Sequence, residues 1–162
     1  MSVTDECLVS NEAYAASFAG PHALPPARRL AVVACMDARL NIFAMLGLKE
    51  GDAHVIRNAG GVVTQDTIRS VVISQRLLGT RKIMLIHHTD CGMLTFTDDQ
   101  FKREIEKEEG IRPHWAPEAF RDLEDDVRQS IRRIEVDPFV PYTEAIRGFV
   151  FNVKTGLLKE VK

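Results

Sequence analysis

Short, unbroken apolar runs alternate with longer amphipathic stretches along most of the chain. Such runs, rich in β-branched residues, fit strands that are buried on both faces of a parallel sheet. The pattern predicts strands at residues 30–34, 53–57, 82–87 and 149–153, and a fifth at 157–161 that forms a hairpin with the fourth. It predicts helices at residues 40–46, 65–78, 98–109 and 117–134. Strands that alternate with helices indicate an α/β fold with a mainly parallel central sheet and flanking helices.

Residues that typically begin or end helices lie at the ends of two predicted helices. Thr64 suits the N-cap of the helix at 65–78, and Gly79 suits its C-terminal stop. Gly47 ends the short helix at 40–46.

The first 27 residues form a separate pattern. Apolar positions at loosely helical spacing occur at residues 3–19, and the helix-breaking pairs Gly20-Pro21 and Pro25-Pro26 follow. We interpret residues 1–27 as an N-terminal helical arm and an irregular link. Because so short an arm has little core of its own, we expect it to pack on something else.

The composition narrows the class of protein. The chain has 162 residues, 45% of them hydrophobic and 27% charged, with a formal net charge of -2. These values fit a single folded domain spanning residues 1–162 and argue against disorder and against a nucleic-acid partner. No apolar run reaches the roughly 20 residues that cross a bilayer, and the acidic N-terminus lacks the features of a secretory signal. We therefore expect a cytoplasmic protein without a membrane partner.

Polar and glycine-rich segments follow three of the predicted strands. Cys35–Arg39 follow the first strand, Asn58–Gly61 the second and His88–Gly92 the third. In sheets of this kind, ligands bind beyond the carboxyl ends of the strands. The three segments should therefore meet at one rim of the sheet.

Three residues on this rim have the chemistry of metal ligands. His88 and Cys91 are three positions apart, and Cys35 follows the first strand. Zn²⁺ prefers thiolate and imidazole ligands, and two cysteines with one histidine leave a fourth position open, as in catalytic sites. An isolated H-x-x-C usually has no such role, and a single cysteine is often a small buried hydrophobe. The combination of three ligand types favours a Zn²⁺ site.

His87, His54 and the third cysteine fit structural roles better, whereas His22 and His114 lie in loops that contain proline and should be surface residues. His87 precedes His88 and should point the other way along a strand, which suggests a core or supporting role. His54 lies within a strand, where we interpret it as a structural histidine. Cys7 should be a packing residue of the arm.

Asp37 and Arg39 follow Cys35 at intervals of two. In an extended segment this spacing places a carboxylate beside the metal and a guanidinium beside the carboxylate. Arginine can bind a carboxylate through two parallel hydrogen bonds and fix its orientation. The alternative is an ordinary surface salt bridge, which contributes little. The neighbouring Cys35 favours the functional pair.

Together these motifs resemble the β-carbonic anhydrases. The resemblance is carried by Cys-x-Asp-x-Arg at residues 35–39, by the glycine loop that begins at Arg57-Asn58, and by His-x-x-Cys at residues 88–91. It implies that Cys35, His88 and Cys91 are zinc ligands and that Asp37 and Arg39 form the family's dyad. It also implies an antiparallel edge strand, an N-terminal helix that reaches onto a partner subunit, and a homodimer or a multiple of dimers.

The activity implied by the resemblance is reversible hydration of carbon dioxide to bicarbonate and a proton. Asn58, Ala59, Gly60 and Gly61 would form a loop that steadies the developing anion, and Asp37 would serve as a fourth zinc ligand in a closed state. Two alternatives stay open: a related zinc hydrolase acting on substrates such as carbon disulfide, and a non-catalytic zinc or redox-sensing module that uses Cys35 and Cys91 as a switchable pair.

Overall fold

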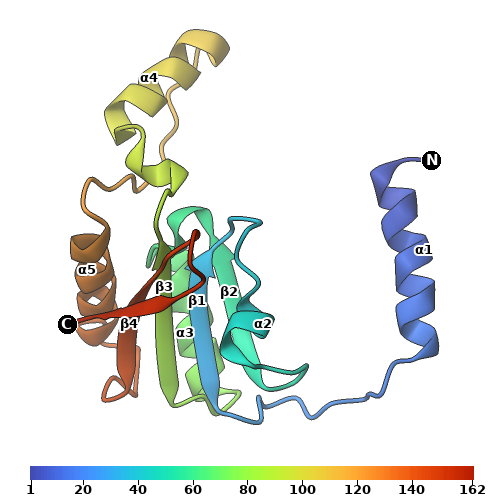
Figure 1. Cartoon of the computed structure of the whole chain (residues 1–162). Helices are drawn as coiled ribbons and strands as arrows, with labels where there is room; N and C mark the ends of the chain where they lie inside the picture. Colours follow the sequence, from blue (N-terminus) through green and yellow to red (C-terminus); the bar gives the residue numbers. More distant parts are fainter.

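The apolar runs form the five strands of one sheet (Figure 1). A computed structural model describes residues 1–162. The strands are β1 (Leu30–Cys35), β2 (Ala53–Asn58), β3 (Lys82–His88), β4 (Ile146–Phe151) and β5 (Leu158–Val161), in the order β2-β1-β3-β4-β5. All neighbours pair in parallel except β4 and β5, which are antiparallel. The predicted α/β fold with an antiparallel edge strand is confirmed.

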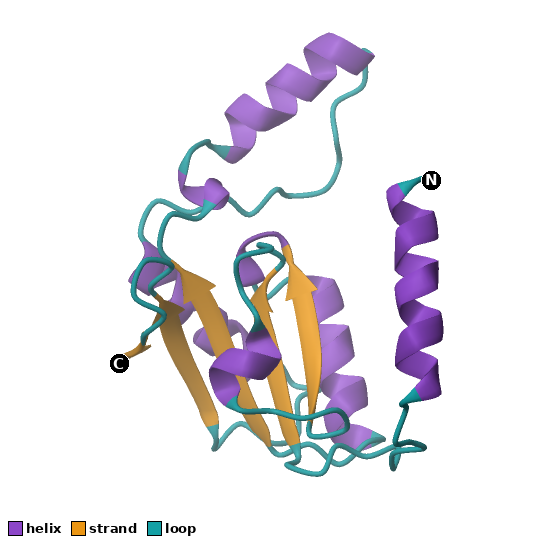
Figure 2. Cartoon of the chain, turned by 45° about the vertical axis from the view of Figure 1, so that its right-hand side comes forward, coloured by secondary structure: helices purple, strands orange, loops and turns teal.

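Helix α2 (Ile42–Leu46) packs on one face of the sheet, and α3 (Gln65–Arg76) and α5 (Leu123–Glu135) pack on the other (Figure 2). The chain also forms helices α1 (Val3–Ala16) and α4 (Asp98–Glu109) and the 3-10 turns η1 (Ala59–Gly61) and η2 (Gly92–Leu94). Because side chains alternate along a strand, Val33 of β1 packs in the cluster with α3 and α5, whereas Val32 packs in the cluster with α2. Both faces of β1 are therefore buried, as its apolar sequence predicts.

The predicted caps are present, with small shifts. The Thr64 hydroxyl accepts a hydrogen bond from the Thr67 N–H at the start of α3. Gly47 adopts a left-handed conformation, with φ of 59°, at the end of α2. The helix α3 ends at Arg76, and Gly79 follows in a left-handed turn.

Two predicted boundaries were wrong. The helix predicted from residue 117 begins at Leu123, because the Asp122 carboxylate caps its first turn by accepting a hydrogen bond from the Asp125 N–H. The strand predicted at 149–153 spans Ile146–Phe151, because its pairing with β3 starts at Ile146. It stops before Asn152, whose side chain accepts hydrogen bonds within the following turn.

The helix α1 stands apart from the sheet (Figure 1). None of its residues is buried, and Leu8, Val9 and Tyr14 expose apolar surface. Cys7 is exposed as well, so the packing predicted for it is not found within this chain. No helix in the structure combines the length and the apolar character needed to span a membrane.

Candidate active site

Three side chains with metal-ligand chemistry meet at the carboxyl ends of β1 and β3. Cys35 ends β1, His88 ends β3 and Cys91 precedes η2. Their ligand atoms lie within 4.8 Å of one another, and all three residues are buried. The parallel pairing of β1 with β3 brings these segments together. The rim inferred from the strand pattern is therefore formed, and it gathers the three predicted ligands.

The donor set fits a zinc ion. The Nδ1 atom of His88 lies 2.9 Å from the Thr89 carbonyl oxygen, which can only accept, so Nδ1 carries the proton. The other ring nitrogen, Nε2, is buried and has no hydrogen-bond partner. A buried, unpaired nitrogen lone pair beside two sulfurs is costly without a cation. Imidazole and thiolate are the ligands that Zn²⁺ prefers.

The surroundings of Cys35 stabilise negative charge on its sulfur. The Cys91 thiol donates to Cys35, the His88 ring lies beside it, and the N–H groups of Asp37 and Gly60 donate further hydrogen bonds, so the pKa of Cys35 falls far below its ordinary value. The interaction with Cys35 raises the pKa of Cys91, whose sulfur also accepts the Met93 N–H. The N–H of Gly60 is thus directed at a ligand sulfur.

Asp37 and Arg39 form a two-point ion pair beside the ligands. The Nε and Nη2 atoms of Arg39 donate to the two carboxylate oxygens of Asp37 at 3.0 and 2.7 Å. The backbone N–H of Arg39 donates to the same carboxylate at 2.8 Å. These bonds hold the pKa of Asp37 well below its usual range. The Oδ2 atom of Asp37 lies 3.7 Å from Nε2 of His88, so an ionised carboxylate borders the cluster.

Two further side chains support this arrangement. Arg57 of β2 donates from Nε to the Cys35 carbonyl at 2.9 Å and from Nη2 to the Asp37 carbonyl at 2.6 Å. Asp90 accepts from Nη1 of Arg39 at 2.8 Å. Neither residue has a role in the site that the sequence alone predicts. The only signal was their position within the glycine-loop and His-x-x-Cys motifs.

The glycine loop packs directly on the Cys35 segment. Asn58 anchors it by donating to the Val62 carbonyl at 2.8 Å, and Ala59 begins η1. Gly60 and Gly61 have φ of 82° and 71°. A Cβ on Gly61 would lie 2.8 Å from the backbone nitrogen of Cys35. This loop therefore needs glycine both for its conformation and for its close approach to the cluster.

We expect Gly61→Ala to destabilise the protein far more than the same change at a free turn. Left-handed strain and overpacking together should cost at least about 3 kcal/mol of the free energy of unfolding, measured by urea titration. The matched control is Gly79→Ala, where φ is 75° and no atom lies within 4 Å of the added Cβ. Strain alone should cost about 1–2 kcal/mol there. Equal losses of the free energy of unfolding in Gly61→Ala and Gly79→Ala would contradict the close approach of Gly61 to the Cys35 backbone.

A cavity of about 340 Å³ opens onto the cluster. Cys35, Asp37 and Cys91 lie on its wall. The other lining residues are small or mainly apolar: Met36, Ala59, Gly60, Gly92, Met93, Thr95 and Phe96. This lining suits a small uncharged substrate next to a polar reaction centre.

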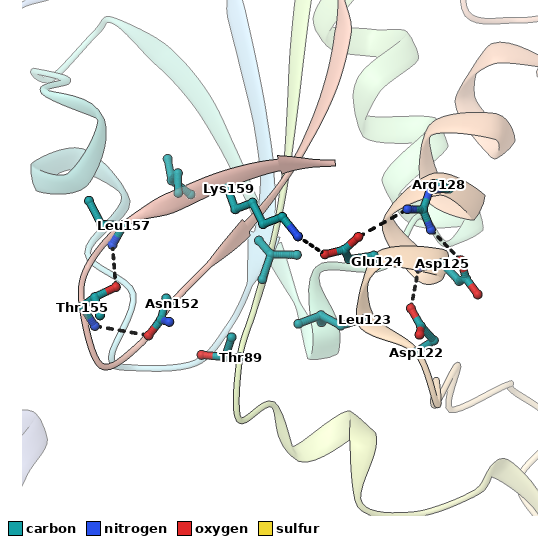
Figure 3. Close-up of a pocket in the computed structure, with 12 residues that line it drawn as sticks. Thr89, Asp122, Leu123, Glu124, Asp125, Arg128, Asn152, Thr155, Leu157 and Lys159 are labelled. Carbon is teal, nitrogen blue, oxygen red and sulfur yellow. Dashed lines mark hydrogen bonds and ion pairs between the residues drawn. The ribbon is translucent and has the colours of Figure 1, made fainter. Parts of the chain in front are cut away.

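The largest cavity, of about 780 Å³, lies elsewhere, between α5 and β5 (Figure 3). Its charged side chains pair with one another: Lys159 lies 2.6 Å from Glu124, and Arg128 pairs with Glu124 and Asp125. It contains no cluster of metal-ligand side chains. Chemistry rather than size therefore identifies the smaller cavity as the candidate site.

Two other histidines, His87 and His54, have structural partners, as predicted. His87 is fully buried, and its Nε2 lies 2.7 Å from the Asp126 carboxylate, which ties β3 to α5. The Nδ1 atom of His54 lies 2.7 Å from the Ser74 hydroxyl.

Comparison with known proteins decides the family. The sequence model of the family described as carbonic anhydrase matches residues 30–139. Beta-carbonic anhydrase 1 of Mycobacterium tuberculosis is 65% identical over 161 residues, which cover 99% of each chain. The chain belongs to the β-carbonic anhydrase family.

Two further similar proteins extend the comparison. The crystal structure of carbonic anhydrase from Streptococcus mutans matches with a TM-score of 0.93 and 41% identity, covering 100% of this chain and 99% of that one. Carbon disulfide hydrolase of Acidithiobacillus thiooxidans is 32% identical over 157 residues, 84% of this chain and 78% of that protein. The chain is thus also similar to proteins named for a different substrate.

Proposed function

We propose that this β-carbonic anhydrase catalyses reversible hydration of carbon dioxide at a zinc ion held by Cys35, His88 and Cys91. The observation that carries the proposal is the meeting of these three ligand atoms around a buried, unpaired His88 Nε2, with the ionised Asp37 carboxylate 3.7 Å away. The name of the 65% identical relative supports the reaction. Free thiols at the centre fit the reducing cytoplasm, which stays the expected location.

The chemistry divides between the metal and the dyad. When bound, Zn²⁺ would lower the pKa of a coordinated water from about 15.7 towards about 7 and so supply a nucleophile. Asp37 accepts a hydrogen bond from the attacking water and orients its lone pair toward the carbon of the substrate. Arg39 keeps Asp37 ionised and fixes its plane through two parallel hydrogen bonds.

The cavity supplies the place for the substrate. Met93 and Phe96 offer an apolar wall beside Cys35 and Asp37, which suits carbon dioxide before attack. Bicarbonate then forms next to Asp37, and repulsion between the two negative charges favours its release.

The proposal predicts that carbon dioxide hydration is faster at about pH 8.5 than at about pH 7, because two thiolate ligands leave the zinc centre less positive and its water harder to ionise. The test is stopped-flow hydration on zinc-loaded protein at both pH values. The pKa of Asp37 is held far below this range, so its titration cannot produce the rise. A rate that is flat or falls with pH would contradict the proposed centre.

The same preparation distinguishes the alternatives. The carbon disulfide hydrolases are 29% to 34% identical to this chain, against 65% for the carbonic anhydrase, so carbon dioxide is the favoured substrate. Turnover of carbon disulfide without carbon dioxide hydration would reverse this choice. Zinc binding with no turnover of either would favour a metal or redox module, although such a module needs neither Asp37 nor Arg39.

We also propose that two copies associate through α1. No residue of α1 is buried within its own chain, and Leu8 and Val9 are 61% and 58% exposed. Burying this apolar surface on a second subunit would stabilise both copies. Removing residues 1–19 should raise the dissociation constant of the dimer at least about tenfold, a loss of about 1.4 kcal/mol. Analytical ultracentrifugation measures this, and an unchanged dissociation constant would contradict the role of the arm.

A further inference from the structure

Arg39 is held by two carboxylates, and only one of them belongs to the dyad. Its Nη1 donates to Oδ2 of Asp90 at 2.8 Å, and its Nη2 donates to the Asp90 backbone oxygen at 2.9 Å. Asp90 lies 51 positions from Arg39, between the ligands His88 and Cys91. These bonds therefore join the two segments that carry the metal ligands.

The backbone of Asp90 is shaped for this contact. Its φ is 57°, a left-handed conformation that aspartate and asparagine tolerate better than other non-glycine residues. In this conformation both its side chain and its carbonyl oxygen reach the same guanidinium. Four of the five N–H groups of Arg39 are thus used by Asp37 and Asp90.

The position of Arg39 determines whether the Asp37 carboxylate can turn and bind the metal. Asp37 Oδ2 lies only 3.7 Å from the His88 nitrogen, and a carboxylate oxygen is itself a zinc ligand. The two hydrogen bonds from Arg39 hold both oxygens of Asp37 in a hydrogen-bonding role. An arginine bound to Asp37 alone could turn together with it, whereas an arginine also bound to Asp90 cannot.

We propose that Asp90 is a positioning residue that holds Arg39 in place and thereby keeps Asp37 off the metal. The inference rests on the proposed function, since it concerns the same zinc centre. Asp90 would in this way keep the fourth coordination position of the metal free for the reacting water. Arg39 and Asp90 are 46% and 74% exposed, so their contact should contribute little to the stability of the fold.

The test is anion binding to Co²⁺-loaded protein, followed by visible absorption during a titration with azide. In Asp90→Ala, Asp37 should compete for the fourth position, and azide should bind about tenfold more weakly than in the wild type. Asp90→Asn keeps a hydrogen-bond acceptor and tolerates the left-handed conformation. Its affinity for azide should therefore lie between that of the wild type and that of Asp90→Ala. If Asp37 did not compete for the metal, loss of the negative charge of Asp90 would instead strengthen binding of the azide anion. The direction of the change in azide affinity therefore tests the proposal.

Two controls separate positioning from general damage. In an Asp37→Asn background the Asp90→Ala change should no longer weaken azide binding, because the competing carboxylate is gone. The matched control is Glu118→Ala, since Glu118 also has a left-handed backbone, with φ of 61°, and pairs with Arg133 at 2.9 Å outside the site. It should bind azide as the wild type does.

The outcomes are distinct. Unchanged or tighter azide binding in Asp90→Ala, or equal weakening in the Asp37→Asn background, would overturn the role of Asp90 and leave the proposed function standing. A wild type that takes up one Co²⁺ per chain without binding azide would also overturn the role of Asp90, because Asp37 would then close the fourth position despite it. A wild type that does not take up one Co²⁺ per chain would overturn the proposed centre and this inference with it.

Discussion

Cys35→Ala is expected to remove both the metal and the activity. Cys35 is the only ligand supplied by β1, and the remaining pair, His88 and Cys91, would hold Zn²⁺ with two protein ligands instead of three. Losing the several kcal/mol that the metal supplies should reduce carbon dioxide hydration at least about 1000-fold, at about 1.36 kcal/mol for each factor of ten. Mass spectrometry under non-denaturing conditions measures the zinc content beside the rate.

The chain contains a matched control for this substitution. Cys7 is exposed on α1 and lies outside the cluster, so Cys7→Ala should keep one zinc per chain and the full rate. A Cys35→Ala protein with stoichiometric zinc and normal turnover would contradict the ligand assignment.

Asp37→Ala and Arg39→Ala are expected to reduce the rate while zinc stays bound. Neither side chain belongs to the three-ligand cluster, so the metal content should remain at one per chain. Each variant should lose about 100- to 1000-fold in kcat, since the attacking water loses the group that orients it. Arg39→Ala acts through Asp37, which keeps its carboxylate but loses its two hydrogen bonds from the guanidinium.

An ordinary ion pair serves as the comparison for the dyad. Asp99 and Arg112 pair at 2.8 Å on the surface near α4, and Asp99→Ala removes this contact without touching the cavity. Its rate should match the wild type. If Asp37→Ala were equally harmless, the pair beside Cys35 would be a surface salt bridge and no more.

The sequence predicted the architecture and the ligands because both depend on strong local patterns. The apolar run at 30–34, with Val32 and Val33 at its centre, favours burial on both faces, which places Cys35 at the end of an inner strand. His88 ends the neighbouring strand and Cys91 follows it, so pairing of β1 with β3 is enough to unite the three residues. No long-range information beyond the parallel sheet was needed.

The remaining parts of the site depend on contacts that a single sequence does not show. The bond between Arg39 and Asp90 spans 51 positions and needs the left-handed backbone of Asp90. The need for glycine at Gly61 arises from the backbone of Cys35, on a different strand. The start of α5 was misplaced because the charged stretch before it has helical composition, whereas the capping hydrogen bond of Asp122 determines the boundary.

Zinc-edge X-ray absorption of the zinc-loaded protein tests the central claim most directly. The account predicts two sulfur ligands at about 2.3 Å, one nitrogen at about 2.0–2.1 Å and one light atom in the fourth position. Three or four sulfur ligands, or a shell of nitrogen and oxygen alone, would contradict a catalytic centre built from Cys35, His88 and Cys91.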